Sequence, residues 1–200
     1  MIKLASILSE MLDPSKVGSY QLITPGAKPD GGSDMQPSIS GTEEFSDGTT
    51  ETTYKFDFMN AKNRRMNIEI VMGRERGGAE PNMVISFGVT SRGDDKWKTM
   101  TGAGDLKEIL GTIIKAVKSV MGSEEINSND ELFAVSYQPA DDRRERIYKY
   151  FIEKYFPSFR LEVRKIKDPE TGEMVPDPRQ PAYKTFINRN YQHERPIQSY

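Results

Sequence analysis

The sequence predicts an α/β domain in which an antiparallel strand meander is followed by a helix, a strand, a helix and a strand, with extended segments at both ends. Residues 54–58 and 66–72 alternate apolar and polar side chains, as half-buried strands do. Residues 106–121 and 147–155 instead repeat apolar side chains every three to four positions, which is typical of amphipathic helices. An apolar run at 132–137 separates the two helices and indicates a buried strand.

The first 53 residues of the 200-residue chain predict a short helix followed by an extended arm. An apolar stripe in residues 2–12 favours an amphipathic helix, which Pro14 would end. Residues 24–53 are rich in proline, glycine, serine, threonine and aspartate. A segment of this composition buries too little apolar surface to offset its chain entropy. We therefore expect residues 1–53 to lie mostly outside the core.

Four strands are predicted in the first half of the core, at residues 54–58, 66–72, 83–89 and 97–100. The segments between them are short and polar. Connections of this length are too short for crossovers, so neighbouring strands should run antiparallel.

The first helix of the core is predicted to pack its apolar face on this meander, with Leu110, Ile113 and Ile114 fully buried. A last strand at residues 159–166 closes a core that we place at residues 54–166. The apolar stripe of the helix consists of Leu106, Ile109, Leu110, Ile113, Ile114, Val117, Val120 and Met121.

Residues 167–200 predict an extended C-terminal tail. Three prolines, at 176, 178 and 181, interrupt regular structure at its start. The rest of the tail is polar but carries aromatic side chains, which commonly anchor an unstructured segment on a partner. Both ends of the chain therefore supply candidate partner-binding residues: Leu4, Leu8, Met11, Tyr183, Phe186, Tyr191 and Tyr200.

Composition and charge exclude several classes of protein. The chain has no cysteine and a single histidine, His193, so disulfides and Cys- or His-based metal sites are excluded and we expect no metal. Residues 1–53, 54–156 and 157–200 carry net charges of −5, +1 and +2. No block has the strong positive charge of a nucleic-acid-binding domain. No apolar run reaches membrane-spanning length, so we expect no membrane partner and a cytosolic origin.

The order of meander, glycine-rich turn, helix, strand and helix resembles the central part of the GNAT acetyltransferase fold over residues 54–166. The turn before the first helix is similar to the Gly-x-Gly/Ala signature of that family. The resemblance implies that backbone N–H groups of Gly102, Ala103 and Gly104 cradle the pyrophosphate of acetyl-CoA, aided by the helix dipole. It also implies that Tyr148 is the general acid that protonates the CoA thiolate. The later helix of the family is similar to this chain at Arg144, Ile147, Tyr148, Tyr155 and Phe156.

The same residues have a simpler structural interpretation. Asp105 stands at the N-cap of the first helix, where its carboxylate would bind the N–H groups that a pyrophosphate needs. Tyr148 fits the apolar rhythm of its own helix, which favours core packing. Among the other acid–base candidates, Tyr137 lies in the strand between the helices, and Asp57 and Glu69 are expected to point outward from their strands.

The opening Met-Ile-Lys-Leu-Ala-Ser-Ile-Leu-Ser-Glu, the Thr-Gly-x-Gly-Asp turn and the Arg-x-x-x-Tyr helix together resemble small accessory proteins of tailed bacteriophages. The resemblance implies a short amphipathic leader, and Leu8-Ser9-Glu10 matches the pattern that phage maturation proteases cut. Our leading hypothesis is a non-catalytic phage protein without a cofactor, in the virion or the host cytoplasm, that binds neighbouring subunits through its arms. The alternatives are an acetyl-CoA-dependent N-acetyltransferase and a phage effector that binds a host protein.

Overall fold

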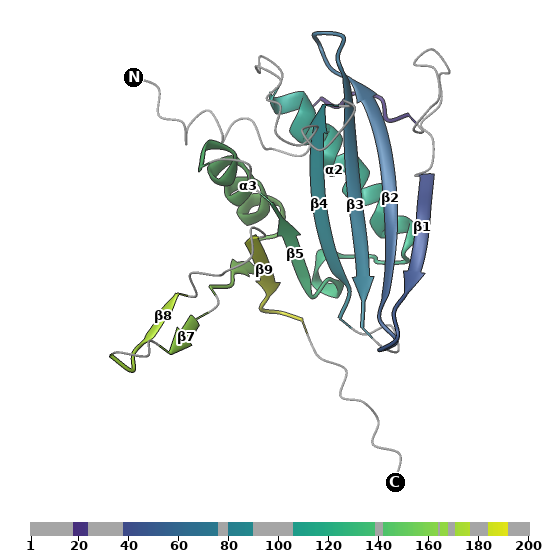
Figure 1. Cartoon of the computed structure of the whole chain (residues 1–200). Helices are drawn as coiled ribbons and strands as arrows, with labels where there is room; N and C mark the ends of the chain where they lie inside the picture. Colours follow the sequence, from purple (N-terminus) through teal and green to yellow (C-terminus); the bar gives the residue numbers. More distant parts are fainter. Residues whose placement is uncertain are drawn as a thin grey trace, which may run out of the picture.

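The computed structural model describes residues 18–23, 38–75, 80–89, 106–138, 142–163, 165–167, 171–176 and 184–191, and Figure 1 shows their arrangement. The elements are β1 (Ser38–Glu44), β2 (Thr50–Met59), β3 (Arg65–Arg74), β4 (Asn82–Val89), α2 (Leu106–Ser123), the 3-10 turn η2 (Asn129–Glu131), β5 (Ala134–Tyr137), α3 (Asp142–Tyr155), β6 (Phe159–Leu161), β7 (Lys165–Lys167), β8 (Met174–Pro176) and β9 (Lys184–Asn188).

Seven strands form one mixed sheet in the order β1-β2-β3-β4-β5-β9-β6, and β7 pairs with β8 in a separate two-stranded sheet. Strands β2, β3 and β4 pair antiparallel in sequence, which confirms the predicted meander at residues 54–58, 66–72 and 83–89, and β1 adds a further antiparallel strand at its edge. The pair formed by β4 and β5 is parallel, with α2 in the connection between them. The α/β class is therefore confirmed. The predicted strand at 97–100 lies outside the described residues.

Helix α2 lies along one face of the sheet, behind β2, β3 and β4 in the view of Figure 1. Its apolar stripe and the inward side chains of the meander belong to one hydrophobic core. Leu110, Ile113 and Ile114 are 1 %, 1 % and 6 % exposed, so their predicted burial is confirmed. Amphipathic periodicity of 3.6 residues in the helix and of two in the strands is enough to place these faces against each other.

The prediction of an irregular arm up to residue 53 is wrong for residues 38–53. Strand β1 pairs antiparallel with β2, which itself begins at Thr50 rather than at Tyr54. The two strands are joined by a tight turn in which Phe45 and Thr49 share a backbone hydrogen bond and Gly48 has a φ of 85°. Glycine adopts this left-handed conformation without steric cost, so Asp47-Gly48 closes a hairpin. Backbone pairing along the edge compensates for the low apolar content of β1.

Residues 18–23 also belong to the core, contrary to the expectation for the N-terminal arm. Leu22 is 3 % exposed and Ile23 is 7 % exposed. Ile23 exchanges two backbone hydrogen bonds with Asp57, extending the edge of β2 beyond β1. The backbone N–H of Tyr20 donates to Oγ1 of Thr112 on α2 at 2.9 Å. The predicted helix in residues 2–12 lies outside the described residues.

The C-terminal segment 184–191 is likewise part of the fold, so the predicted end of the core at residue 166 is wrong. Strand β9 lies between β5 and β6 and pairs antiparallel with both. The predicted strand at 159–166 is divided into the short β6 and the separate β7. Buried Asn188 fixes the end of β9, because its Nδ2 donates to the carbonyl of Leu132 at 2.9 Å and its Oδ1 accepts from the N–H of Asn190 at 2.9 Å. Strand pairing on both sides thus outweighs the polar composition of the tail.

Candidate functional site

In this fold, a ligand site is expected beyond the carboxyl ends of β4 and β5. In open α/β sheets, ligands bind in the crevice beyond the carboxyl ends of parallel strands, where the connections diverge. Here the parallel register ends at the pair Ile85 and Tyr137, while β4 continues to Val89. Beyond this pair, β4 is paired with β3 alone within the described part of the chain.

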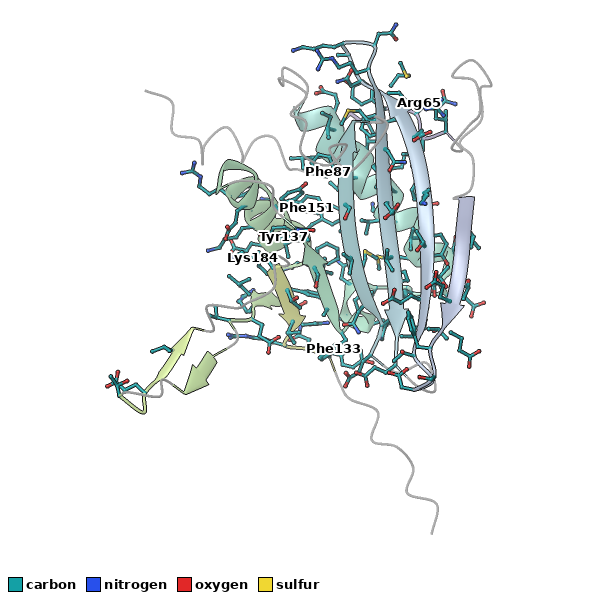
Figure 2. All side chains as sticks on the ribbon, in the orientation of Figure 1. Arg65, Phe87, Phe133, Tyr137, Phe151 and Lys184 are labelled. Atoms are coloured by element: carbon teal, nitrogen blue, oxygen red, sulfur yellow. The ribbon has the colours of Figure 1, made fainter. Side chains whose placement is uncertain are left out.

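Aromatic side chains occupy the space where β4 and β5 separate. Phe87 of β4 packs edge-on against Tyr148 of α3, with ring centroids 5.3 Å apart. Tyr148 stacks on Tyr137 of β5 at 4.7 Å, and Tyr137 stacks on Phe186 of β9 at 5.9 Å. Figure 2 shows Phe87, Phe151 and Tyr137 in the region between β4 and α3. We call Phe87, Tyr148, Tyr137 and Phe186 the aromatic stack.

Tyr148 lies within this stack, which agrees with the interpretation that its side chain packs in the core. Tyr148 is 8 % exposed, and its ring packs edge-on with Phe87 and stacks on Tyr137. A general acid has to bring its hydroxyl within hydrogen-bond reach of a substrate atom. A ring held between two aromatic neighbours contributes chiefly to packing. The other residues implied by the acetyltransferase resemblance, Gly102 to Gly104, and the predicted N-cap residue Asp105 lie outside the described residues.

Tyr137 holds its proton more tightly than an ordinary tyrosine. Burial raises the pKa of its hydroxyl above the usual value of 10.0, and the negative charges of Glu145 and Glu153 raise it further. The hydroxyl donates to the backbone carbonyl of Glu145 at 3.4 Å. The carboxylate of Glu145 also pairs with Lys184 of β9 at 3.5 Å. The hydroxyl of Tyr137 therefore links β5 to α3.

Comparisons of the chain with models of protein families, with curated proteins and with solved structures find no significant match.

Asp57 lies on the outer face of β2, as expected from alternation, but its carboxylate is covered by an ion pair with the partly exposed Arg65. Asp57 is 3 % exposed. Its Oδ2 accepts hydrogen bonds from Nε and Nη2 of Arg65 at 2.9 and 2.6 Å, and its Oδ1 accepts one from Asn67 at 3.1 Å. A buried carboxylate whose oxygens are satisfied in this way holds neighbouring strands together. Glu69, by contrast, remains half-buried and pairs with Lys55 at 3.5 Å.

A second polar cluster, which the sequence did not predict, ties the end of α2 to the sheet. The carboxylate of Glu124 accepts a hydrogen bond from the hydroxyl of Tyr54, and its Oε2 accepts from Nε and Nη2 of Arg74 at 3.2 and 3.0 Å. Arg74 also donates to the backbone carbonyl of Glu124 at 3.1 Å. Burial raises the pKa of Tyr54, and so do the hydrogen bond to Glu124 and the charge of that carboxylate. The cluster satisfies the backbone carbonyl of Glu124, just beyond the end of α2, which is a structural role.

The residues described in the structure contain no group of three or more His, Asp or Glu side chains that could hold a metal ion. Within the same residues, no helix is both long enough and apolar enough to cross a membrane.

The predicted partner-binding residues fall into two groups. Phe186 is 0 % exposed inside the sheet, so the prediction that it binds a partner is wrong. Tyr191 packs edge-on against Phe133 at 5.4 Å, and its hydroxyl accepts from the N–H of Glu80 at 3.1 Å, so it contacts its own chain. The remaining candidates, which lie outside the described residues, are Leu4, Leu8, Met11, Tyr183 and Tyr200.

The structure offers different apolar side chains to solvent. The exposed large hydrophobic residues of the described part are Ile39, Phe45 and Val163, at 59 %, 43 % and 43 %. Ile39 lies on β1, Phe45 follows the last residue of β1, and Val163 stands shortly before β7. Ile39 and Phe45 belong to no repeating apolar face, so periodicity does not single them out, whereas Val163 fits the alternation that predicts a strand at 159–166 but lies beyond the end of β6.

Proposed function

We propose that this protein is a non-catalytic structural subunit of a tailed-bacteriophage particle, which binds neighbouring subunits and needs no cofactor. The resemblance of its opening segment, turn and second helix to phage accessory proteins motivates the class. The aromatic stack at the carboxyl ends of β4 and β5 is the observation that supports a non-catalytic role. The protein would be made in the host cytoplasm and retained in the virion.

The aromatic stack fills the position where a substrate of an α/β protein would ordinarily enter. Tyr137 and Phe186 are 1 % and 0 % exposed, and Tyr148 is 8 % exposed. Removing a buried aromatic side chain costs about 3–5 kcal/mol. A ligand that displaced these rings would have to supply a comparable free energy before it gained affinity. The stack therefore supports a role in packing for the residues nearest to the expected crevice.

The exposed edges of the structure support a role in binding other proteins. Strand β1 stands at one edge of the seven-stranded sheet, and β7 and β8 form a two-stranded sheet of their own. Unpaired strand edges are templates for pairing with another chain. The three exposed hydrophobic side chains lie at or beside these two elements, where a partner would bury them.

The proposal is tested by mass spectrometry of purified particles from the phage that encodes the chain. A structural subunit should co-purify with the particles at a constant ratio to the major head or tail protein. Its absence from the particles would contradict the proposal. Recovery of the chain on a host protein instead would favour the effector.

A second candidate, an acetyl-CoA-dependent N-acetyltransferase, is favoured by the order of the elements. The meander β1 to β4 leads through α2 to the parallel strand β5, and β9 lies between β5 and β6. This order supports the resemblance to the GNAT fold. An enzyme of that kind would bind the pyrophosphate at Gly102 to Gly104 and protonate the thiolate from Tyr148.

Calorimetry with acetyl-CoA separates this candidate from the first. A structural subunit should give no binding heat with acetyl-CoA. Asp105→Gly should bind anions better than the native chain, because it removes a carboxylate from the N-terminus of α2. Micromolar binding by the native chain would overturn the non-catalytic proposal. Tyr148→Phe, which keeps the ring but loses the hydroxyl, should then lower the rate of transfer without weakening binding.

A further inference from the structure

Both helices cover the same face of the seven-stranded sheet. Helix α2 lies behind the meander in the view of Figure 1. Tyr148 of α3 packs on Phe87 and Tyr137. In the sheet, these two residues lie directly beside Ile68 and Ile85, which face the same hydrophobic core as α2. Neither helix therefore covers the opposite surface of the sheet, which we call the outer face.

The strand register arranges the side chains of the outer face in rows that cross the sheet. One row carries no charge between β2 and β9, and it consists of Thr53, Val71, Val84, Ser136 and Thr185. All five residues are half-buried in the single chain. Small and β-branched side chains of this kind suit a pleated surface that packs against another sheet.

The adjacent row carries charges only at its two ends. It begins with the exposed Glu43 and Glu51, which stand directly opposite each other on β1 and β2, and it ends with the exposed Arg160 on β6. None of the ion pairs found within the described residues involves these three side chains. Like charges at opposite positions repel each other, so a cation would stabilise the acidic end. The residues between the ends are Gly73, Asn82, Ala134 and Ile187.

The other charged side chains that β2 and β3 direct to the outer face are paired within the chain. Lys55 lies 3.5 Å from Glu69, and Arg65 lies 2.6 Å from Asp57. Burial of a charge is costly unless the charge is paired and hydrogen-bonded. A partner could therefore cover these strands without burying an unpaired charge at their centre.

We propose that two copies of this chain pack their outer faces together about a two-fold axis that runs along β4. This rotation reverses the order of the strands, so each row of one copy faces the same row of the other copy in the opposite direction. Glu43 then faces Arg160 at both edges, and Val84 faces Val84 on the axis. The contact deepens the proposed function by naming a second copy as the neighbour, and only its place in a particle rests on that function.

The charges select this axis over the alternative. A two-fold axis across the strands would place β1 over β1, and the acidic ends of the two copies would repel each other. The axis along β4 also brings Glu162, which follows β6 and donates its N–H to Thr185, opposite the uncharged Gly41. An isologous contact of this kind closes as a dimer.

Asn82 supplies a reciprocal polar contact on the axis. It occupies the central strand of the charged row, so the rotation places it opposite itself. Its Nδ2 donates to the backbone carbonyl of Glu80 at 2.8 Å. An amide nitrogen carries two hydrogens, so the second hydrogen and Oδ1 are available to the facing carboxamide. Paired polar side chains of this kind fix the register of a symmetric interface.

The outer face is large enough for a stable dimer. One strand residue covers about 16 Å², from a strand spacing of about 4.8 Å and a rise of about 3.3 Å. The strands of this sheet therefore present roughly 750 Å², close to the ~800 Å² per partner of a standard interface. Packed sheets cross at about 30°, so the match is closest along β4. The long side chains of Glu43 and Arg160 span the offset at the edges.

A substitution on the axis tests the contact with the full-length protein. Val84→Glu places two carboxylates opposite each other in the dimer. Val163→Glu makes the same substitution at a position that is 43 % exposed and lies beyond the end of β6. Sedimentation velocity over a wide range of concentrations should show a wild-type dimer. The dimer of Val84→Glu should be weaker by at least about tenfold, and Val163→Glu should match the wild type.

Charge reversal tests the orientation of the two copies. Glu43→Lys/Glu51→Lys and Arg160→Glu should each weaken the dimer by roughly fivefold or more at low salt, because like charges then face each other. A chain that carries all three substitutions should dimerise like the wild type, because opposite charges face each other again. The control Glu125→Lys/Glu153→Lys makes the same change in net charge as the first variant at exposed positions elsewhere and should leave the dimer unchanged.

Three outcomes would overturn the inference. A wild type that stays monomeric at every concentration would exclude this self-contact, although presence in particles would still uphold the proposed function. An unchanged dimer in Val84→Glu would place the contact elsewhere. A triple variant that stays dissociated would show that the acidic and basic ends do not meet. Circular dichroism checks the fold of each variant, and the charge variants decide if Val84→Glu does not fold.

Discussion

Replacing Phe186 by alanine should destabilise the whole domain, because the side chain lies in the core rather than in a mobile tail. Phe186 is 0 % exposed, stacks on Tyr137 and pairs through its backbone with Val135 and Leu161. Removing a buried phenylalanine ring costs about 3–5 kcal/mol, since both transfer free energy and packing around the cavity are lost. For a domain of this size, that loss lowers the melting temperature by roughly 6–20 °C.

Urea unfolding followed by circular dichroism measures this effect, with the slope of the transition checked for constancy. The control Arg189→Ala removes an exposed side chain just beyond β9 and should change the free energy of unfolding by less than about 0.5 kcal/mol. If Phe186→Ala cost less than about 1 kcal/mol, β9 would not be part of the cooperative fold. The expectation of a partner-binding tail at 167–200 would then regain support.

Two further predictions concern the N-terminal segment and the tyrosines. Thr112→Val removes the acceptor of the Tyr20 N–H and should lower the free energy of unfolding by about 1–3 kcal/mol. Hydrogen exchange at the backbone N–H of Ile23 should accelerate. Unchanged protection of that N–H would contradict the contact. The raised pKa values of Tyr54 and Tyr137 mean that the folded chain keeps protons that the unfolded chain releases above pH 10.0. This contribution to the free energy of unfolding should therefore be complete below pH 10.0 and decrease as the pH rises further. In Tyr54→Phe the free energy of unfolding should decrease less steeply with pH than in the wild type. An equal slope in the variant would count against the assignment to Tyr54.

The meander and the core helix were predictable because their side chains repeat with a clear period. Ile68 and Ile113 are buried where alternation and helical spacing place them. The β1–β2 hairpin was also within reach, since Asp47-Gly48 is a strong turn signal between two strands. The low apolar content of residues 24–53 predicts an irregular arm instead, and backbone pairing between β1 and β2 overrides it.

Other features depend on contacts that no local pattern contains. Strand β9 has one buried aromatic residue, Phe186, and Asn188 fixes its end through carbonyl groups more than 50 residues earlier in the chain. The Tyr54–Glu124 hydrogen bond likewise joins residues 70 positions apart. Alternation places Asp57 on the outer face of its strand, but it does not predict that Arg65 and Asn67 enclose the carboxylate there. Long-range pairing of this kind is visible only in the folded chain.

The central proposal, a structural subunit of a phage particle, is tested most directly by quantitative mass spectrometry across a density gradient of purified particles. The chain should peak in the fraction that contains infectious particles, and its ratio to the major head protein should stay constant through that peak. A chain found only in the soluble fractions of the lysate would contradict the proposal.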